Sequence, residues 1–334
     1  MHRVAPFLIA PIVVMAAAVF LFTQVIVIHM PGKSYRGALP PLSSAQSALA
    51  KRLESDVRSL AGDIGERNLF RHQSLERAAR HIAASFRASE HEVAFQDFVV
   101  RGNTVRNVEG LIPGQEPEAG VVVIGAHYDS VQGSPGANDN ASGVAALLEV
   151  GRALRGRSFR RDIRLAAFVN EEEPFSYTES MGSVRYARHL AERGVRVTAM
   201  VSLETIGYYT DDPGTQRYPF PLSYFYPDRG NFIAFVGNPA SRTLVRAMVR
   251  TFRQSARFPS EGLAAPERIP GVGWSDHWAF WQQGVPAVMV TDTALYRYHE
   301  YHTPGDTPRI LAYDRFARLV EGLITVIAQL AESN

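Results

Sequence analysis

Residues 121–154, VVVIGAHYDSVQGSPGANDNASGVAALLEVGRAL, carry the structural signal from which the rest of the chain can be interpreted. They open with a continuous apolar run, Val121 to Ile124, which is typical of a strand buried in the middle of a sheet. Residues 141–154 have the length and apolar content of a helix, and residues 163–169 form a second buried apolar run. A strand, a helix and a second strand in this order predict a βαβ unit with parallel strands.

The same alternation continues on both sides of this unit. Upstream, the sequence predicts a helix capped by Ser43 or Ser44, a helix at 74–88, and strands at 92–100 and 107–112. Downstream, it predicts helices near 181–192 and at 240–254, 276–283 and 313–331, with strands at 197–203, 232–236 and 286–291. Residues 207–230, rich in Pro and Tyr, are expected to form a long loop. We therefore predict an α/β fold: a three-layer sandwich whose central, mostly parallel mixed sheet is flanked by helices.

The composition limits the classes of function. The chain has 334 residues, a formal net charge of +2 and no cysteine. The small net charge argues against nucleic acid as a partner, and the lack of cysteine excludes disulfides and cysteine metal sites. The sequence leaves the oligomeric state open.

The N-terminus predicts a membrane segment. No charged residue occurs from Val4 to Ile28, and Phe7 to Ile28 is almost wholly apolar, long enough to cross a hydrocarbon core of ~30 Å. We predict that residues 1–30 form a transmembrane anchor and residues 31–44 a linker, with a cleaved secretion signal as the alternative. The folded domain, residues 45–334, is then expected in the periplasm or outside the cell.

Acidic and imidazole side chains follow the predicted buried strands. His127 and Asp129 come after the strand at 121–124, and Glu171, Glu172 and Glu204 follow later strands. Ligands of open α/β sheets bind at the carboxyl ends of the strands, so these side chains are expected to meet. Carboxylates crowded together repel one another unless a divalent metal lies between them, and zinc binds both imidazole nitrogen and carboxylate oxygen. The pattern therefore predicts a metal site.

Six motifs in order give a more specific identification. They are GAHYDS (125–130), GANDNASGVAALLE (136–149), NEEE (170–173), SLETIGY (202–208), SDHWAFWQQGVPAV (275–288) and YHTPGDT (301–307). Together they resemble the motifs of metallopeptidase family 28, which includes leucyl aminopeptidases, glutamate carboxypeptidase II and glutaminyl cyclases. The resemblance covers roughly residues 45–330. It implies a zinc-exopeptidase fold of the phosphorylase/hydrolase-like type and makes residues 45–334 the catalytic domain.

The resemblance also implies a role for each residue that matches a motif. It implies two zinc ions, bound by His127, Asp139, Glu172, Glu204 and His302. Asp139 would bridge the ions and be joined to Asn140 by a cis peptide bond. Glu171 would be the general base, and Asp129 would bond the second ring nitrogen of His127. Many relatives have Asp where this chain has Glu204. Asp276 and His277 are expected to contact substrate or to support the site.

These roles imply hydrolysis of a terminal peptide bond, most simply by an aminopeptidase. Glu171 would take a proton from the attacking water and pass it to the leaving amine. Two alternatives remain open: an acyltransferase like the glutaminyl cyclases, and a catalytically silent binding ectodomain. Aromatic residues of the loops near 173–181 and 207–230 are expected either to line a specificity pocket or to pack on one another. They are Phe175, Tyr177, Tyr208, Tyr209, Phe225 and Tyr226.

Overall fold

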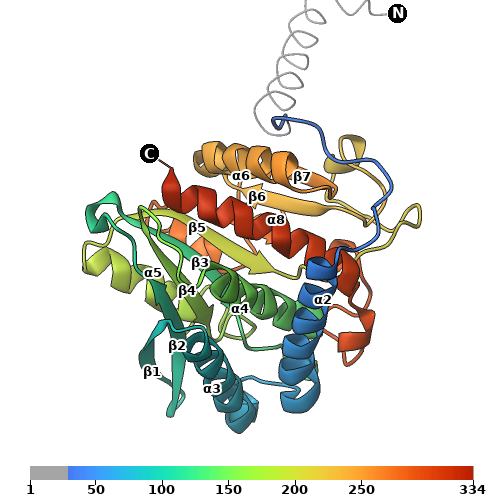
Figure 1. The fold of residues 1–334 in the computed structure, drawn as a ribbon. Helices are drawn as coiled ribbons and strands as arrows, with labels where there is room; N and C mark the ends of the chain where they lie inside the picture. Colours follow the sequence, from blue (N-terminus) through green and yellow to red (C-terminus); the bar gives the residue numbers. More distant parts are fainter. Residues whose placement is uncertain (1–28, 334) are drawn as a thin grey trace, which may run out of the picture.

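A computed structural model describes residues 29–333 and is built around one eight-stranded sheet (Figure 1). The strand order is β1-β2-β4-β3-β5-β8-β6-β7. The strands are β1 (Glu92–Val100), β2 (Asn103–Ile112), β3 (Val121–His127), β4 (Asp162–Phe168), β5 (Val197–Glu204), β6 (Ile233–Gly237), β7 (Ser260–Ala264) and β8 (Ala287–Thr291). Strands β4, β3, β5 and β8 run parallel, and so do β6 and β7, whereas β1, β2 and the β6–β8 pair are antiparallel. The sheet is mixed and mostly parallel, as predicted.

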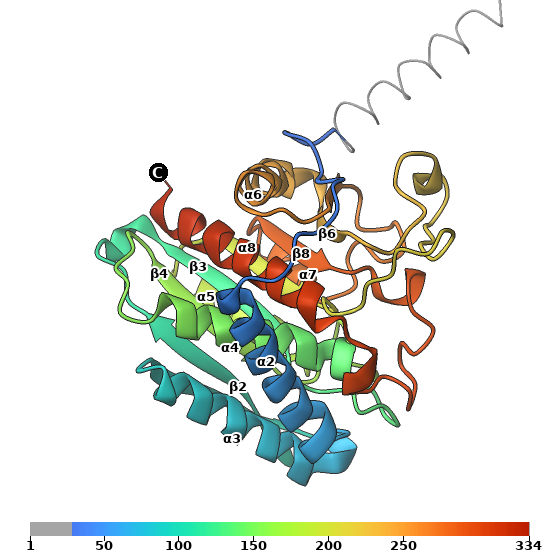
Figure 2. The same cartoon turned by 45° about the vertical axis from the view of Figure 1, so that its right-hand side comes forward.

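Helices cover both faces of this sheet (Figures 1 and 2). One face carries α2 (Ser44–Val57), α3 (His72–Ala88), α4 (Gly143–Leu154), α6 (Arg242–Ser255) and α8 (Tyr313–Glu332). The other face carries α5 (Gly182–Glu192) and α7 (His277–Trp281). The predicted three-layer sandwich is confirmed.

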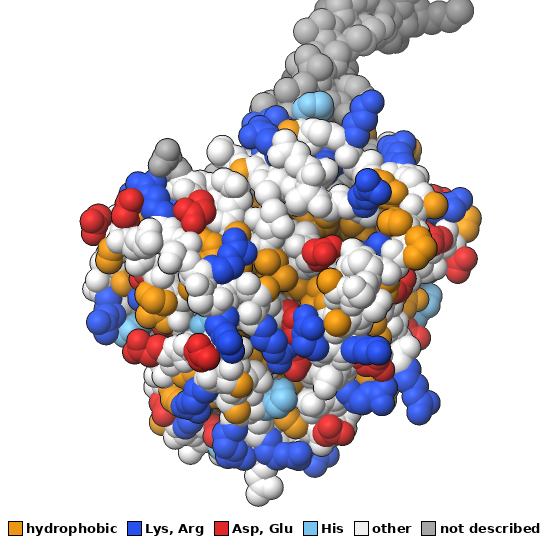
Figure 3. Space-filling view, in the orientation of Figure 1, with side chains coloured by type: hydrophobic (Ala, Val, Ile, Leu, Met, Phe, Trp, Pro, Cys, Tyr) orange, Lys and Arg blue, Asp and Glu red, His pale blue; other side chains and the backbone are white. Residues whose placement is uncertain are grey.

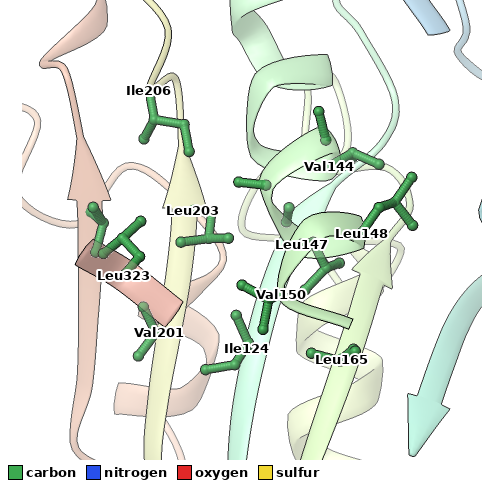
Figure 4. Close-up of a cluster of buried hydrophobic side chains, with 14 of the residues drawn as sticks. Ile124, Val144, Leu147, Leu148, Val150, Leu165, Val201, Leu203, Ile206 and Leu323 are labelled. Atoms are coloured by element: carbon green, nitrogen blue, oxygen red, sulfur yellow. The ribbon is translucent and has the colours of Figure 1, made fainter. Parts of the chain in front are cut away.

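Strand β3 shows why the central strands are apolar throughout. All of its residues are buried. Val122 and Ile124 pack on the α4 and α8 side, as Figure 4 shows for Ile124, whereas Val121 and Val123 pack under α5 and α7. Because both faces are covered, the strand has no outward position for a polar residue, and its sequence does not alternate.

The largest difference from the predicted elements is β7. Residues Ser260–Ala264, SEGLA, form an edge strand parallel to β6, where the sequence predicts none. The segment is short, contains Ser, Glu and Gly, and lacks both alternation and a continuous apolar run. Its strand conformation comes from pairing with β6 rather than from local preference.

Residues 29–43 lie along the domain before α2 begins. Met30 is buried, and its side chain packs so closely on Gly262 that a Cβ there would lie 2.8 Å from Met30 Cγ. Arg253 of α6 donates hydrogen bonds to the carbonyl oxygens of Pro31 and Gly32. Ser43 then caps α2, as the sequence predicts. The segment predicted as a linker is thus attached to α6 and β7.

Within residues 29–333, no helix combines the length and the hydropathy needed to cross a bilayer. The anchor predicted from Val4 to Ile28 lies outside the described residues.

Candidate metal centre

The predicted site residues meet at the carboxyl ends of the central parallel strands. His127 is the last residue of β3 and Glu204 the last of β5. Glu171 and Glu172 follow β4, which pairs with β3 in parallel. Asp139 lies in the loop between β3 and α4, and His302 in the loop that precedes α8. The topology therefore brings together residues that are up to 175 positions apart.

One group forms around the ring of His127. Its Nε2 atom lies 3.1 Å from Asp139 Oδ1 and 3.3 Å from Glu204 Oε2. The longer side chain of Glu204 thus brings a carboxylate to the position that the resemblance requires. Glu204 Oε2 also accepts a hydrogen bond of 2.7 Å from Ser275 Oγ, which holds the carboxylate in place.

A second group forms around His302 and shares Asp139 with the first. His302 Nε2 lies 3.0 Å from Asp139 Oδ2 and 3.3 Å from Glu172 Oε2. The two oxygens of Asp139 therefore point to different histidines. Glu171 lies beside both groups, with Oε2 3.9 Å from His127 Nε2.

The donor atoms of both groups fit metal ions. Nitrogen and oxygen ligands bound to one tetrahedral zinc at about 2.0–2.1 Å lie about 3.3 Å from one another. The 3.0–3.3 Å separations above match that spacing. His127 Nε2 and Asp139 Oδ1 are buried and lack a hydrogen-bond partner among the described residues, and such atoms are rare unless an ion or water satisfies them.

Electrostatics point the same way. Burial raises the pKa of Glu171, Glu172 and Glu204, and neighbouring carboxylates raise it further. Burial opposes ionisation of Asp139 as well, but its contacts with two imidazoles lower its pKa. Burial likewise lowers the pKa of His127, yet the surrounding carboxylates outweigh it and hold that pKa well above its ordinary value. So much negative charge in a buried place favours bound cations.

Asp129 has two contacts at this site. Its Oδ1 atom is 3.6 Å from Nδ1 of His127, while its main-chain oxygen is closer, at 3.2 Å. Its carboxylate accepts hydrogen bonds from the main-chain nitrogens of Glu171 and Glu172, both at 3.2 Å. Asp129 therefore positions the two glutamates in addition to facing the ring of His127.

Asp306 is a functional residue that the sequence does not single out, although it lies in the YHTPGDT motif. Its carboxylate accepts hydrogen bonds from the main-chain nitrogens of Asn138, at 2.8 Å, and Asp139, at 3.1 Å. It thus ties the loop of His302 to the loop of Asp139. The peptide bond between Asp139 and Asn140 is cis, as the resemblance implies.

Arg67 is a second residue that the sequence leaves unmarked. It is completely buried and has no acidic hydrogen-bond partner within residues 29–333. Its guanidinium instead donates to four carbonyl oxygens, those of Gly65, Tyr128, Pro135 and Gly136. Burial lowers its pKa to about 10, so the group stays charged at neutral pH. Arg67 holds the chain between Asp129 and Asp139 in shape.

An Arg67→Leu variant is expected to lose about 3 kcal/mol or more of folding free energy, because several buried carbonyl oxygens would lose a charged donor. Thermal denaturation followed by circular dichroism measures this loss. Arg71→Leu is the matched control. Arg71 is largely exposed, and its ion pair with Glu66 is long, at 3.6 Å, so its loss should cost little stability. Equal melting temperatures for the two variants would contradict the role given to Arg67.

Asp276 and His277 are placed behind the site. Both side chains are fully buried, and Nε2 of His277 donates to the carbonyl oxygen of Val272 at 2.8 Å. Burial raises the pKa of Asp276 to about 7 and lowers that of His277 to about 4. Neither residue lines the pocket beside Glu204, and this burial favours the supporting role, while direct contact with substrate stays a prediction.

The aromatic residues singled out from the loops differ in burial: Phe175 and Tyr209 are buried, Tyr177 is exposed, and the other three are half-buried. Tyr208 stacks on Tyr298, and Tyr209 packs edge-on against Phe258. Of the six, only Tyr226 lines the pocket that opens beside Glu204. That pocket takes its other aromatic walls from residues the sequence does not indicate.

Comparisons with known proteins agree with this geometry. The model of peptidase family M28 matches residues 107–327. Uncharacterized protein YfbL of Escherichia coli (strain K12) is 38% identical over 93% of this chain and 97% of its own length. Leucine aminopeptidase 1 of Arthroderma otae is 26% identical over 85% of this chain and 73% of its own.

Solved structures share the fold. BSAP, a zinc aminopeptidase from Bacillus subtilis, superposes with a TM-score of 0.70 over 85% of this chain and 95% of its own, at 17% identity. The glutaminyl cyclase of Tannerella forsythia superposes with a TM-score of 0.60 over 84% of this chain and 98% of its own, at 18% identity. The fold is therefore common to both activities and does not choose between them.

Proposed function

Because the chain belongs to peptidase family M28 and is a zinc metallopeptidase, we propose that it is an aminopeptidase with two zinc ions. The observation that carries the proposal is the sharing of Asp139 between two groups of donor atoms. His127 and Glu204 complete one group, and Glu172 and His302 the other. A carboxylate with one oxygen in each group is the arrangement that a pair of adjacent ions needs.

Zinc ions held by these residues would polarise the carbonyl of the scissile bond and make the attacking water more acidic. The residues of the chain supply the other steps. Glu171 belongs to neither of the two groups that share Asp139, and its carboxylate lies beside both, within reach of His127 and Glu172. It can accept a proton from the attacking water and return that proton to the leaving amine.

The charge of the site favours a free amino end over a carboxyl end. The carboxylates of Asp139, Glu171, Glu172 and Glu204 balance the charge of two divalent ions, and behind them the carboxylates of Asp129 and Asp306 outnumber the buried cation beside them, Arg67. A site with excess negative charge attracts an ammonium group and repels a carboxylate. This supports attack at the N-terminal residue.

Hydrolysis of matched substrates tests the proposal. The purified protein with zinc is expected to release nitroaniline from aminoacyl-nitroanilides, leave N-acetylated ones intact, and shorten peptides from their amino end. Shortening from the carboxyl end would contradict the proposed direction. Cyclisation of N-terminal glutamine without hydrolysis would favour the acyltransferase, and zinc-loaded protein inactive in all assays would favour the silent ectodomain.

We also propose that residues 1–30 anchor the protein in a membrane, with the domain in the periplasm or outside the cell. Besides the apolar sequence, the charge near residue 29 supports contact with a membrane surface. Helix α6, RTLVRAMVRTFRQS, has four arginines and no acidic residue, and Arg246 donates to the carbonyl oxygen of His29. Figure 3 shows Lys and Arg side chains around the place where residue 29 meets the domain. Basic residues there suit an anionic lipid surface.

Cell fractionation tests the anchor. The full chain is expected in the membrane fraction, with the domain accessible to protease added from the non-cytoplasmic side. A form that starts at His29 serves as the control and is expected to be released from the membrane. A full-length chain that stays in the cytosol would contradict the anchor, whereas a released chain shortened at its N-terminus would support secretion after cleavage.

A further inference from the structure

A pocket opens next to the candidate metal centre, with mostly apolar and aromatic residues around it. Glu204 and Tyr301 lie on its wall at the end near the metal centre. The pocket is bounded by the loops that contain Tyr218, Trp274 and Tyr296, and its floor is the open face of the sheet over β8, β6 and β7. Its position beside Glu204 makes it the natural place for a substrate side chain.

The strand register fixes a line of residues along the floor of this pocket. Glu204 of β5 pairs with Thr291 of β8, Thr291 with Ala234 of β6, and Ala234 with Glu261 of β7. Side chains of paired residues point to the same face of a sheet, and all four of these line the pocket. Three strand spacings separate the two ends, so Glu204 and Glu261 are about 14 Å apart along the row.

Between Glu204 and Glu261 the floor of the pocket is formed by short side chains and is mostly apolar. Ala234 has only a methyl group, and Thr291 is a small residue with its hydroxyl close to that of Thr205, at 3.1 Å. A second row of paired residues, Met289, Val236 and Leu263, continues the floor with apolar side chains. A long substrate side chain can lie across this surface without burying an unsatisfied polar group.

The far end of the pocket has the chemistry of a cation site. The rings of Tyr218 and Tyr226 stack with their centroids 5.8 Å apart, and both residues line the pocket with Glu261. Aromatic faces and a carboxylate attract the same kind of ligand, an ammonium or a guanidinium group. Burial raises the pKa of Glu261, and a cation brought into the pocket would restore the charged form.

Glu261 already has two partners, a hydroxyl and a guanidinium. The hydroxyl of Ser34 donates a hydrogen bond to its carboxylate. Arg253 forms an ion pair with it at 3.5 Å, while the other N–H groups of Arg253 are bonded to Ser260 and to the carbonyl oxygens of residues 31 and 32. Arg36 contributes only a coulombic interaction with Glu261. Arg217 also lines the pocket but is exposed, so solvent screens its charge.

On the premise that the chain is an aminopeptidase, we propose that this pocket selects substrates whose first residue is arginine or lysine. The apolar stem of that side chain lies over Thr291 and Ala234, and its charged end meets Glu261. An extended arginine side chain reaches about 7 Å from its α-carbon, and Thr291 lies two strand spacings, about 10 Å, from Glu261 along the row. A substrate whose α-carbon is held over Thr291, next to Glu204, therefore places its charged end within hydrogen-bond distance of Glu261.

Kinetics on arginyl-, lysyl-, leucyl- and phenylalanyl-nitroanilide test this selection. In the wild type, kcat/KM for arginine and lysine is expected to exceed that for leucine by about tenfold or more. Glu261→Gln is expected to lower kcat/KM for the two basic substrates about 10- to 100-fold, because a charged hydrogen bond is lost, and to leave leucine nearly unchanged. Glu267→Gln, at an exposed position outside the pocket, is the matched control.

A second variant and a binding measurement test the same selection without relying on Glu261→Gln alone. Ala234→Leu should block the row, so that basic substrates fail while alanyl-nitroanilide is still cleaved. Calorimetry should show that arginine binds the wild type more tightly than leucine does and that Glu261→Gln removes the difference. Leucine or phenylalanine as the best substrate, with no effect of Glu261→Gln, would overturn the selection and leave the aminopeptidase standing. No hydrolysis of any substrate would overturn the proposed function, and the binding result would still decide the role of Glu261.

Discussion

A Glu171→Gln variant should bind its metal ions normally and yet lose kcat by about 10²- to 10⁴-fold, the range that a positioned general base contributes. The amide has the shape of the carboxylate but cannot accept the proton of the attacking water. The four carboxylate oxygens near His127 and His302 belong to Asp139, Glu172 and Glu204. None belongs to Glu171, so the substitution should leave the arrangement of these ligands intact. Metal analysis and steady-state kinetics on the same preparation measure both parts of the prediction.

Glu173→Gln is the matched control for this variant. Glu173 lies two residues further along the same loop and is exposed, so the same chemical change should leave activity close to that of the wild type. A Glu171→Gln enzyme that turns over at the wild-type rate would show that another group accepts the proton. Loss of metal together with activity would show that Glu171 acts as a ligand.

Replacement of Asp139 by alanine should lower activity as much as Glu171→Gln or more, but through loss of metal binding. Its two oxygens contact His127 at 3.1 Å and His302 at 3.0 Å, so the substitution removes one donor from each group. We expect weaker binding of both ions and a loss of kcat/KM of at least about 10³-fold, as for removal of a metal-activated nucleophile. Metal content after dialysis and kcat/KM are the measurements.

The fold of the Asp139→Ala variant should persist. The loop is held by Asn138 and Asn140, whose side chains bond Asp292 and the carbonyl oxygen of Leu203, and by Asp306, which accepts from the main chain. Asp129→Asn is the graded comparison: Asp129 faces His127 without joining either group, so a loss of about 10- to 100-fold is expected. An Asp139→Ala protein that retains two ions and full activity would contradict the bridging role.

The central strands and the site residues could be predicted from the sequence for a physical reason. Strands β3, β4 and β5 are buried on both faces, so each appears as an apolar run with a sharp end. The polar residues that follow such ends must lie at the same edge of a parallel sheet. His127, Glu171, Glu172 and Glu204 could therefore be brought together without knowing any distance.

The residues that the sequence did not reveal depend on contacts between distant segments. Arg67 resembles any other arginine until the chain from Tyr128 to Gly136 folds around it. Glu261 belongs to an edge strand with no sequence signature, and its alignment with Glu204 follows from the register of three strand pairs. Local propensity carries no information on register between strands far apart in the chain.

The two loops show the same limit. Their aromatic residues were visible, but whether a ring packs inward or lines a pocket depends on what lies opposite. Tyr209 meets Phe258 and is buried, whereas Tyr226 bonds the carbonyl oxygen of Gly262 and faces the pocket. Both partners belong to segments more than 30 residues away.

Titration of the metal-free protein with zinc, followed by metal analysis and by hydrolysis of an aminoacyl-nitroanilide, tests the central claim most directly. Two groups of donors that share Asp139 predict that two zinc ions bind per chain and that full activity is reached only when both are present. Saturation of binding and activity at one ion per chain, or activity that needs no metal, would contradict the account.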